Sequence, residues 1–147
     1  MKIYVDADAC PVVEIVLRLA KRHGCPVVLV ADTAHRIQRP GAECVTVDQG
    51  KDAADLYLAN RLQAGDILVT QDYGLAALAL ARGGRPIRQD GVCYTAENID
   101  GLLLTRHLSQ KARRAGARTR GPSRRTAAED EAFARALEEL LACGPGR

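Results

Sequence analysis

The sequence has few aromatic residues and no tryptophan, so its core must consist of aliphatic side chains. Aromatics make up 3% of the 147 residues, whereas hydrophobic residues make up 47% and charged residues 27%. This balance excludes a disordered chain, a collagen-like chain and a coiled-coil rod. No apolar run approaches the roughly 20 residues that a membrane helix requires. Because Asp6 and Asp8 interrupt the stretch where a signal peptide would be apolar, we expect a soluble, cytoplasmic protein.

Closely spaced cysteines are also lacking. The five cysteines are odd in number and widely separated, and only one of the three histidines, His23, lies near a cysteine in the sequence, two residues before Cys25. A disulfide framework or a structural zinc site is therefore not expected. We expect the thiols to be small buried side chains.

Acidic residues are absent from residues 101–128, which we call the basic segment. This segment carries +8 and leaves −5 on the rest of a chain whose net charge is +3. Its cations are Arg106, Lys111, Arg113, Arg114, Arg118, Arg120, Arg124 and Arg125. Such a run is often a solvated surface, but it can also bind phosphates by releasing counterions. Since the basic segment contains no aromatic residue, we expect it to contact a nucleic-acid backbone rather than to stack on bases.

Short apolar runs alternate with segments of helical periodicity. We predict strands at residues 2–6, 26–31, 44–47, 66–70 and 85–88, the last as an edge strand. We predict helices at residues 11–23, 52–62, 74–81, 95–114 and 126–142, with Thr95 and Thr126 as N-caps. This order predicts an α/β fold, a three-layer α/β/α sandwich with a mainly parallel sheet. We expect an α/β domain over residues 1–115, a basic loop at 116–125, and a C-terminal helix at 126–147 packed on the same domain.

Three acidic motifs lie at or just after the ends of predicted strands. They are Val5-Asp6-Ala7-Asp8, Gly50-Lys51-Asp52-Ala53-Ala54-Asp55 and Ile67-Leu68-Val69-Thr70-Gln71-Asp72. Because the loops that leave the carboxyl ends of parallel strands share one edge of the sheet, these carboxylates are expected to converge. Each motif also has a purely structural interpretation. Asp8 and Asp72 can cap the helices that follow them, and the helix dipole favours Asp52 or Asp55 in a first turn.

Converging carboxylates repel one another unless a cation offsets their charge. Oxygen ligands without nearby His or Cys suit Mg²⁺ or Mn²⁺, and such ions can polarise a phosphoryl oxygen and activate water. Together with the basic segment, this predicts a nucleic-acid phosphodiester as substrate. The predicted metal ligands are Asp6, Asp52, Asp55 and Asp72, with Asp8 as a further catalytic residue and Lys51 as a phosphate contact.

Six motifs occur in order along nearly the whole chain: VDADACPV, GKDAAD, VTQDYGLA, Asn98-Ile99, Arg113-x-x-Gly116 and Gly121-Pro122. Together they resemble the YaiI/YqxD family of uncharacterised bacterial proteins. That family is in turn similar to PIN-like domains, which are metal-dependent ribonucleases. The resemblance implies that Asp6, Asp52 or Asp55, and Asp72 hold metal, with Thr70 or Asp8 in support. Asn98, from the motif Asn98-Ile99, is a further candidate for a supporting residue. The Asp6-x-Asp8 pair and the basic segment depart from the PIN pattern.

The leading hypothesis is therefore a Mg²⁺- or Mn²⁺-dependent nuclease acting on RNA. One alternative is a non-catalytic module that binds nucleic acid or protein and whose carboxylates are structural. Another is a phosphatase of the haloacid dehalogenase type, with Asp6 as nucleophile, Asp8 as general acid and Thr70 in support. The helix predicted soon after Asp8 and the absence of a late core lysine weigh against the phosphatase.

Overall fold

The computed structural model describes residues 1–8, 10–32, 38–49, 53–116 and 124–144. Within them, five parallel strands form one sheet in the order β3-β2-β1-β4-β5. The strands are β1 (Ile3–Asp6), β2 (Val27–Asp32), β3 (Glu43–Val47), β4 (Ile67–Val69) and β5 (Arg85–Ile87). The predicted parallel sheet is confirmed, and β5 lies at an edge as expected.

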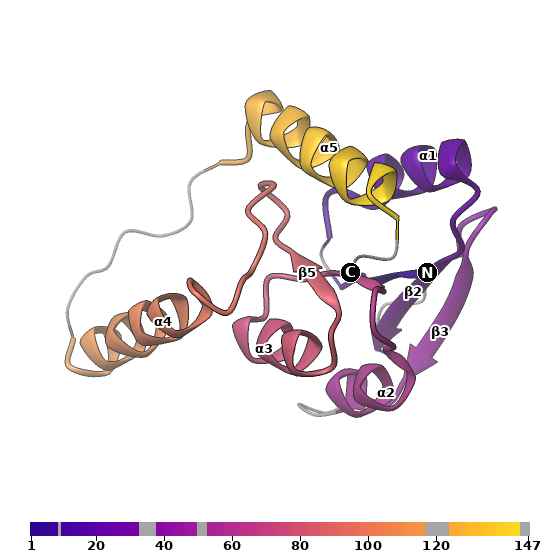
Figure 1. Ribbon diagram of the computed structural model, residues 1–147. Helices are drawn as coiled ribbons and strands as arrows, with labels where there is room; N and C mark the ends of the chain where they lie inside the picture. The colour runs from indigo at the N-terminus through magenta and orange to yellow at the C-terminus, as the bar shows by residue number, and fades with distance from the viewer. Residues whose placement is uncertain (9, 33–37, 50–52, 117–123, 145–147) are drawn as a thin grey trace.

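Helices cover both faces of the sheet, which gives the predicted three-layer α/β/α arrangement. The described helices are α1 (Val13–His23), α2 (Ala53–Arg61), α3 (Tyr73–Ala81), α4 (Ile99–Arg114) and α5 (Ala127–Ala142). Helices α1 and α5 lie together on one face, and α2 and α3 lie on the other (Figure 1).

Alternate side chains of the inner strands enter two separate cores. Ile3 and Val5 of β1 pack in the core that includes Phe133 of α5, whereas Tyr4 packs in the core that includes Leu75 of α3. Both faces of β1, β2 and β4 are therefore buried. This burial explains why the sequence of these strands is continuously apolar instead of alternating.

Two helix ends form as the sequence predicts. Gly24 ends α1 in the left-handed conformation, with φ 64°. Thr126 begins α5 in a capping box, in which its hydroxyl accepts from the Glu129 amide and the Glu129 carboxylate accepts from the Thr126 amide.

Two predicted helix starts are wrong by a few residues. Helix α1 begins at Val13, because residues 11 and 12 form a turn before it. Helix α4 begins at Ile99, with Asn98 and not Thr95 at its N-cap. Thr95 and Asn98 instead hydrogen-bond each other's backbone amides, at 2.9 and 3.1 Å, and this pairing closes a turn before the helix.

The five cysteines are free, but the expectation that they are buried is wrong for two of them. Cys44 is exposed because it lies on the edge strand β3, and Cys143 is exposed at the end of α5. The other three cysteines are half-buried.

Helix α4 is the element least integrated into the layers. Ile99, Leu102 and Leu103, near its start, join a small third core with α3. Farther along, Leu104 and Leu108 are exposed, and the helix points away from the sheet (Figure 1). None of the helices in the described ranges is long and apolar enough to cross a membrane.

Candidate active site

The strand order creates a topological switch point between β1 and β4. From β1 the chain passes through α1 to β2 on one side, and from β4 it passes through α3 to β5 on the other. The two connections leave in opposite directions over opposite faces (Figure 1), and ligands of open α/β sheets bind in the crevice between such strands. Asp6 ends β1 and Thr70 directly follows β4, so both predicted residues lie at this point.

A chain of hydrogen bonds joins Asp6, Thr70 and Asp72. The Thr70 hydroxyl donates to Oδ2 of Asp6 at 3.1 Å and accepts from the backbone amide of Asp72 at 3.0 Å. Oδ1 of Asp72 in turn accepts from the amide of Leu75 at 3.2 Å. A threonine two residues before Asp72 therefore connects the ends of two neighbouring strands.

Thr70 is held firmly enough to fix this geometry. Its side chain is fully buried, and its backbone amide donates to the carbonyl of Ile87 at 3.1 Å. Its own carbonyl accepts from the hydroxyl of Tyr94 at 3.2 Å. With both its backbone and its hydroxyl engaged, Thr70 sets the position of the Asp6 carboxylate.

Asp8 and Asp55 approach the same region from other elements. Both oxygens of Asp8 lie 3.3–3.4 Å from the backbone amide of Asp32, at the carboxyl end of β2. Asp8 is thus not the cap of α1, whose N-cap is Val12 without a side-chain hydrogen bond. Asp55 lies in the first turn of α2.

The electrostatics of Asp6 show that these carboxylates interact. Burial raises the pKa of Asp6 to about 6 from 3.8, although the hydrogen bond from Thr70 opposes this change. The negative charges of Asp8, Asp72 and Asp55 raise the pKa further. We call these four residues the aspartate rim; their mutual repulsion makes the rim a place where a cation would be stabilised.

The structural interpretation of Asp72 is also confirmed. Asp72 is the N-cap of α3, where its side chain satisfies the Leu75 amide. The guanidinium of Arg106, from α4, lies 3.7 Å from the same carboxylate oxygen. Asp72 therefore links the aspartate rim to the first cation of the basic segment.

The complete predicted ligand set cannot be assembled from the described residues. Asp52 and Lys51 lie outside them, and among the side chains that the structure does describe, no three of His, Cys, Asp or Glu are grouped closely enough to hold a metal ion. The rim offers carboxylate oxygens, which match Mg²⁺ or Mn²⁺ in kind. The metal site therefore stays a prediction.

Asn98 has structural contacts in the loop before α4. Its side-chain oxygen accepts from the amide of Thr95 at 2.9 Å, and its side-chain amide donates to the carbonyl of Cys93 at the same distance. Its interactions hold the turn from which α4 starts, so Asn98 supports the position of that helix.

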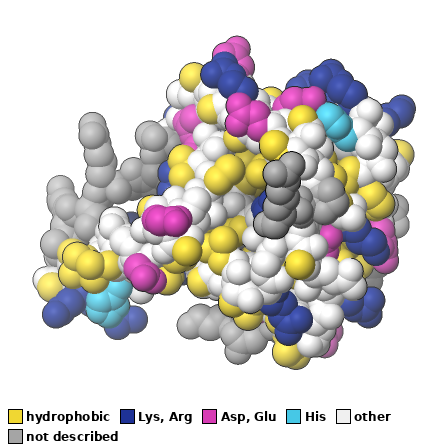
Figure 2. All heavy atoms as spheres, viewed as in Figure 1, with side chains coloured by type: hydrophobic (Ala, Val, Ile, Leu, Met, Phe, Trp, Pro, Cys, Tyr) yellow, Lys and Arg dark blue, Asp and Glu magenta, His cyan; other side chains and the backbone are white. Residues whose placement is uncertain are grey.

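The cations of the basic segment have different surroundings. Arg106, Lys111, Arg113 and Arg114 are exposed along α4, and Figure 2 shows Lys and Arg side chains at the outer end of this helix, at the lower left. Arg124 is also exposed. Arg118 and Arg120 lie outside the described residues.

Arg125 is mainly structural. Its guanidinium donates to Asp130 and to the backbone carbonyl of Gln89, both at 2.7 Å. These bonds fasten the start of α5 to the end of β5, and they leave the side chain only 23% exposed.

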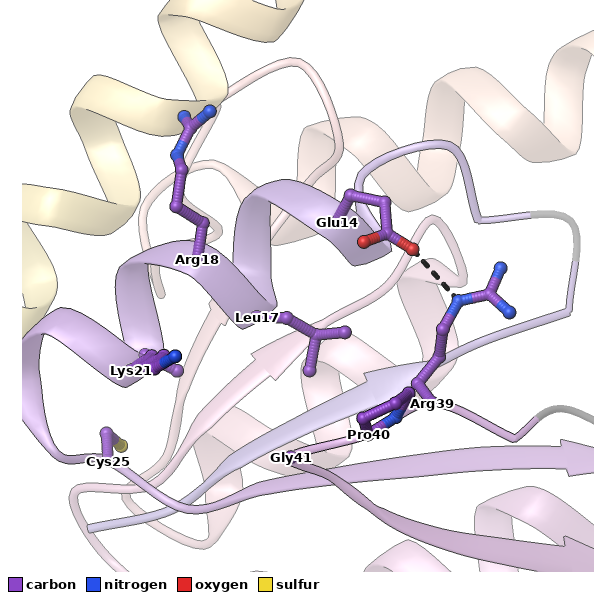
Figure 3. A pocket seen from close by; sticks show the side chains of 9 residues that line it. Glu14, Leu17, Arg18, Lys21, Cys25, Arg39, Pro40 and Gly41 are labelled. Carbon is purple, nitrogen blue, oxygen red and sulfur yellow. Dashed lines mark hydrogen bonds and ion pairs between the residues drawn. The ribbon is translucent and has the colours of Figure 1, made fainter.

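One pocket lies away from the aspartate rim. It has a volume of about 600 Å³ and runs along α1, where Leu17 points toward Pro40 and Gly41 (Figure 3). Glu14 and Arg39 form an ion pair of 2.9 Å at its side. None of the rim aspartates lines this pocket, so its size alone does not mark the site.

A smaller cleft, which the sequence did not predict, lies between the start of α3 and the middle of α4. Tyr73, placed in the sequence far from the basic segment, lines this cleft together with Arg106 and Arg113. One signal could have found it: Tyr73 immediately follows Asp72, so any cation that approaches Asp72 also approaches Tyr73.

Comparisons with known proteins agree on one family. A model of the uncharacterised YaiI/YqxD family matches residues 4–143. A UPF0178 protein of Exiguobacterium sibiricum is 55% identical over 141 residues, which cover 96% of each chain. A UPF0178 protein of Ruminiclostridium cellulolyticum is 48% identical over 93% of this chain and 90% of its own, and one of Clostridium acetobutylicum is 46% identical over 98% and 99%. No solved structure matches. The chain belongs to the YaiI/YqxD family.

Proposed function

We propose that this protein is a Mg²⁺- or Mn²⁺-dependent nuclease that hydrolyses RNA at the aspartate rim. The observation that carries the proposal is the hydrogen-bonded chain Asp6–Thr70–Asp72, which spans the switch point between β1 and β4. Such a switch point is where open α/β sheets bind ligands. The similarity of the acidic motifs to those of PIN-like domains supports the same activity.

The residues present fit a divalent cation in the chemistry of their donors. Asp6 and Asp72 would hold it, together with Asp52 or Asp55 and with Asp8 nearby. When bound, the ion supplies a Lewis acid for the phosphoryl group and lowers the pKa of water. Thr70 keeps the Asp6 carboxylate in place through its 3.1 Å hydrogen bond.

The cations beside the rim supply affinity for the substrate. Arg106 lies next to Asp72, and Lys111, Arg113 and Arg114 extend along the same helix. A phosphate held by Arg106 lies next to the carboxylates, and the other cations bind neighbouring phosphates. Contacts of this kind are independent of sequence and weaken as salt concentration rises.

The test is cleavage of a 5′-labelled oligouridine in millimolar Mg²⁺ or Mn²⁺, with EDTA as the metal-free control. Asp6→Asn keeps an acceptor for Thr70 but removes the charge. We expect it to lower the cleavage rate on the order of 100-fold or more, as is typical when a group that stabilises the transition state is lost. Glu131→Gln, an equal charge change at an exposed position of α5, should leave the rate unchanged. Wild-type activity in a folded Asp6→Asn variant would refute the proposal.

A second candidate, a non-catalytic nucleic-acid-binding module, is favoured by one observation. Asp72 is occupied as the cap of α3 and lies beside a guanidinium, which is sufficient reason for a carboxylate at that position. This candidate predicts salt-dependent binding of the oligouridine in EDTA, no cleavage in either metal, and no effect of Asp6→Asn on binding.

A further inference from the structure

The cleft between α3 and α4 has a volume of about 430 Å³. One side is a continuous face of α4, and the other is the turn from β4 into α3. The α4 residues are Thr105, Arg106, Ser109, Gln110 and Arg113, and the residues of the turn are Gln71 and Tyr73. The spacing of the α4 residues by three or four positions places them on one side of the helix.

The lining of this α3–α4 cleft is suited to an anion. Among the described residues that line it, two carry guanidinium groups, the rest carry hydroxyl or amide groups, and none is a carboxylate. Arg106 and Arg113 are spaced to lie on the same helix face two turns apart, so they can contact one extended anionic ligand. Guanidinium groups bind phosphate oxygens through paired hydrogen bonds, which gives affinity and orientation together.

The cleft also adjoins the aspartate rim. Arg106 contributes to its lining and lies 3.7 Å from Oδ1 of Asp72. Gln71 and Tyr73, which line the opposite side, flank Asp72 in the sequence. A ligand in the cleft is therefore next to the site proposed for phosphodiester hydrolysis.

Tyr73 provides an aromatic ring in a fixed position. It is half-buried, and its ring meets that of Tyr94 edge to face, with centroids 5.7 Å apart and an interplanar angle of 66°. Tyr94 is buried and is anchored by its hydroxyl to the carbonyl of Thr70. Tyr73 is thus held against a residue that is itself tied to the rim.

We propose that the α3–α4 cleft binds one nucleotide of a nucleic-acid strand, with the phosphates on its two sides at Arg106 and Arg113 and its base stacked on Tyr73. The inference rests on the proposed function for its class of ligand, and it adds a base contact to the backbone contacts expected from the sequence. Because a base must leave its own stack to meet Tyr73, the site accepts unpaired strands. Stacking of this kind tolerates any base.

The experiment measures the binding of a fluorescently labelled oligouridine by anisotropy, in EDTA so that no cleavage occurs. Tyr73→Leu should weaken binding about tenfold, within the range for the loss of one stacked base. Tyr73→Phe keeps the ring and should bind like the wild type. Arg113→Gln should weaken binding and lower the slope of log affinity against log salt concentration by about 0.7. The matched control Arg135→Gln, at an exposed position of α5, should change neither quantity.

Three results would overturn the inference. One is unchanged binding in Tyr73→Leu or Arg113→Gln, and another is equal weakening in Tyr73→Phe and Tyr73→Leu. Binding of a duplex with the same dependence on Tyr73 would also overturn it. An oligothymidine in parallel shows whether the strand is RNA or DNA. Cleavage assays separate the two proposals. Binding that depends on the Tyr73 ring, without cleavage, supports the nucleotide site in the cleft and refutes the nuclease proposal. Cleavage that depends on Asp6, with binding unaffected by Tyr73→Leu, supports the nuclease proposal and refutes the nucleotide site.

Discussion

Thr70 is the residue on which the site depends most. Its hydroxyl donates to Asp6 and accepts from the Asp72 amide. Its own backbone amide donates to Ile87 of β5, and its own carbonyl accepts from the hydroxyl of Tyr94. A buried hydroxyl with both of its roles filled holds its partners more firmly than a surface residue can. The Thr-x-Asp pattern is therefore both a helix start and a connection between β1 and β4.

Asp6 should give the metal-free protein a characteristic dependence of stability on pH. Burial and neighbouring carboxylates raise its pKa in the folded state to about 6 from 3.8. Ionisation therefore costs the folded state more than the unfolded state, so the free energy of unfolding decreases as pH rises from about 4 through about 6. Asp6→Asn cannot ionise; in EDTA it should be as stable as the wild type near pH 4 and more stable near pH 8.

Urea denaturation followed by circular dichroism at both pH values measures this difference. Asp48→Asn, an exposed aspartate after β3, is the control and should leave the pH dependence unchanged. If Asp6→Asn differs from the wild type by the same amount at both pH values, the carboxylate of Asp6 does not carry the effect.

Among the site residues, sequence patterns located the positions better than the contacts. The charges of Asp8, Asp55 and Asp72 act on Asp6 because parallel strands present their carboxyl ends at one edge, but the described carboxylates are not grouped closely enough to hold a metal ion. The partner of Asp8, the amide of Asp32, could not be predicted because it depends on where the chain turns after β1. Tyr73 was missed for a similar reason, since its meeting with Arg113 depends on the direction of α4.

At the scale of elements, the capping box of α5 should make a measurable contribution to stability. Thr126→Ala removes the hydroxyl that accepts from the Glu129 amide, and we expect it to lower the free energy of unfolding by about 1 kcal/mol. Thr126→Ser keeps the acceptor and should cost far less. The measurement is the urea midpoint at an unchanged slope. Equal urea midpoints for the two variants would show that the Thr126 cap does not contribute to the free energy of unfolding.

The order of elements could be predicted because each has a distinct signal. The buried strands are short apolar runs, and the helices between them have helical periodicity or clear end signals such as Gly24. The start of α4 could not be placed because Thr95 and Asn98 are both good caps, and the chain uses the pair to close a turn. The packing of α4 on α3 has no signal in local sequence.

For the whole molecule, α5 should unfold together with the sheet. Phe133, Leu137 and Leu141 are almost completely buried in the same core as Val5 and Val16. We expect Phe133→Ala to lower the free energy of unfolding by about 3–5 kcal/mol, and Phe133→Leu to cost less because it leaves a smaller cavity. Far-ultraviolet circular dichroism and tyrosine fluorescence should report one coincident transition in urea. Two separate transitions would show that residues 126–147 form an independent unit.

The way α4 is attached to α3 would allow its far end to move relative to the sheet. Its 16 residues extend about 24 Å, yet the apolar side chains that join it to α3 are those near its start, and the ion pair of Arg106 with Asp72 is at its middle. A tilt of about 10° at Ile99 would displace the far end by about 4 Å at that length. Such a tilt would widen or narrow the α3–α4 cleft around strands of different shape, while the sheet and the carboxylates anchored to it keep their positions.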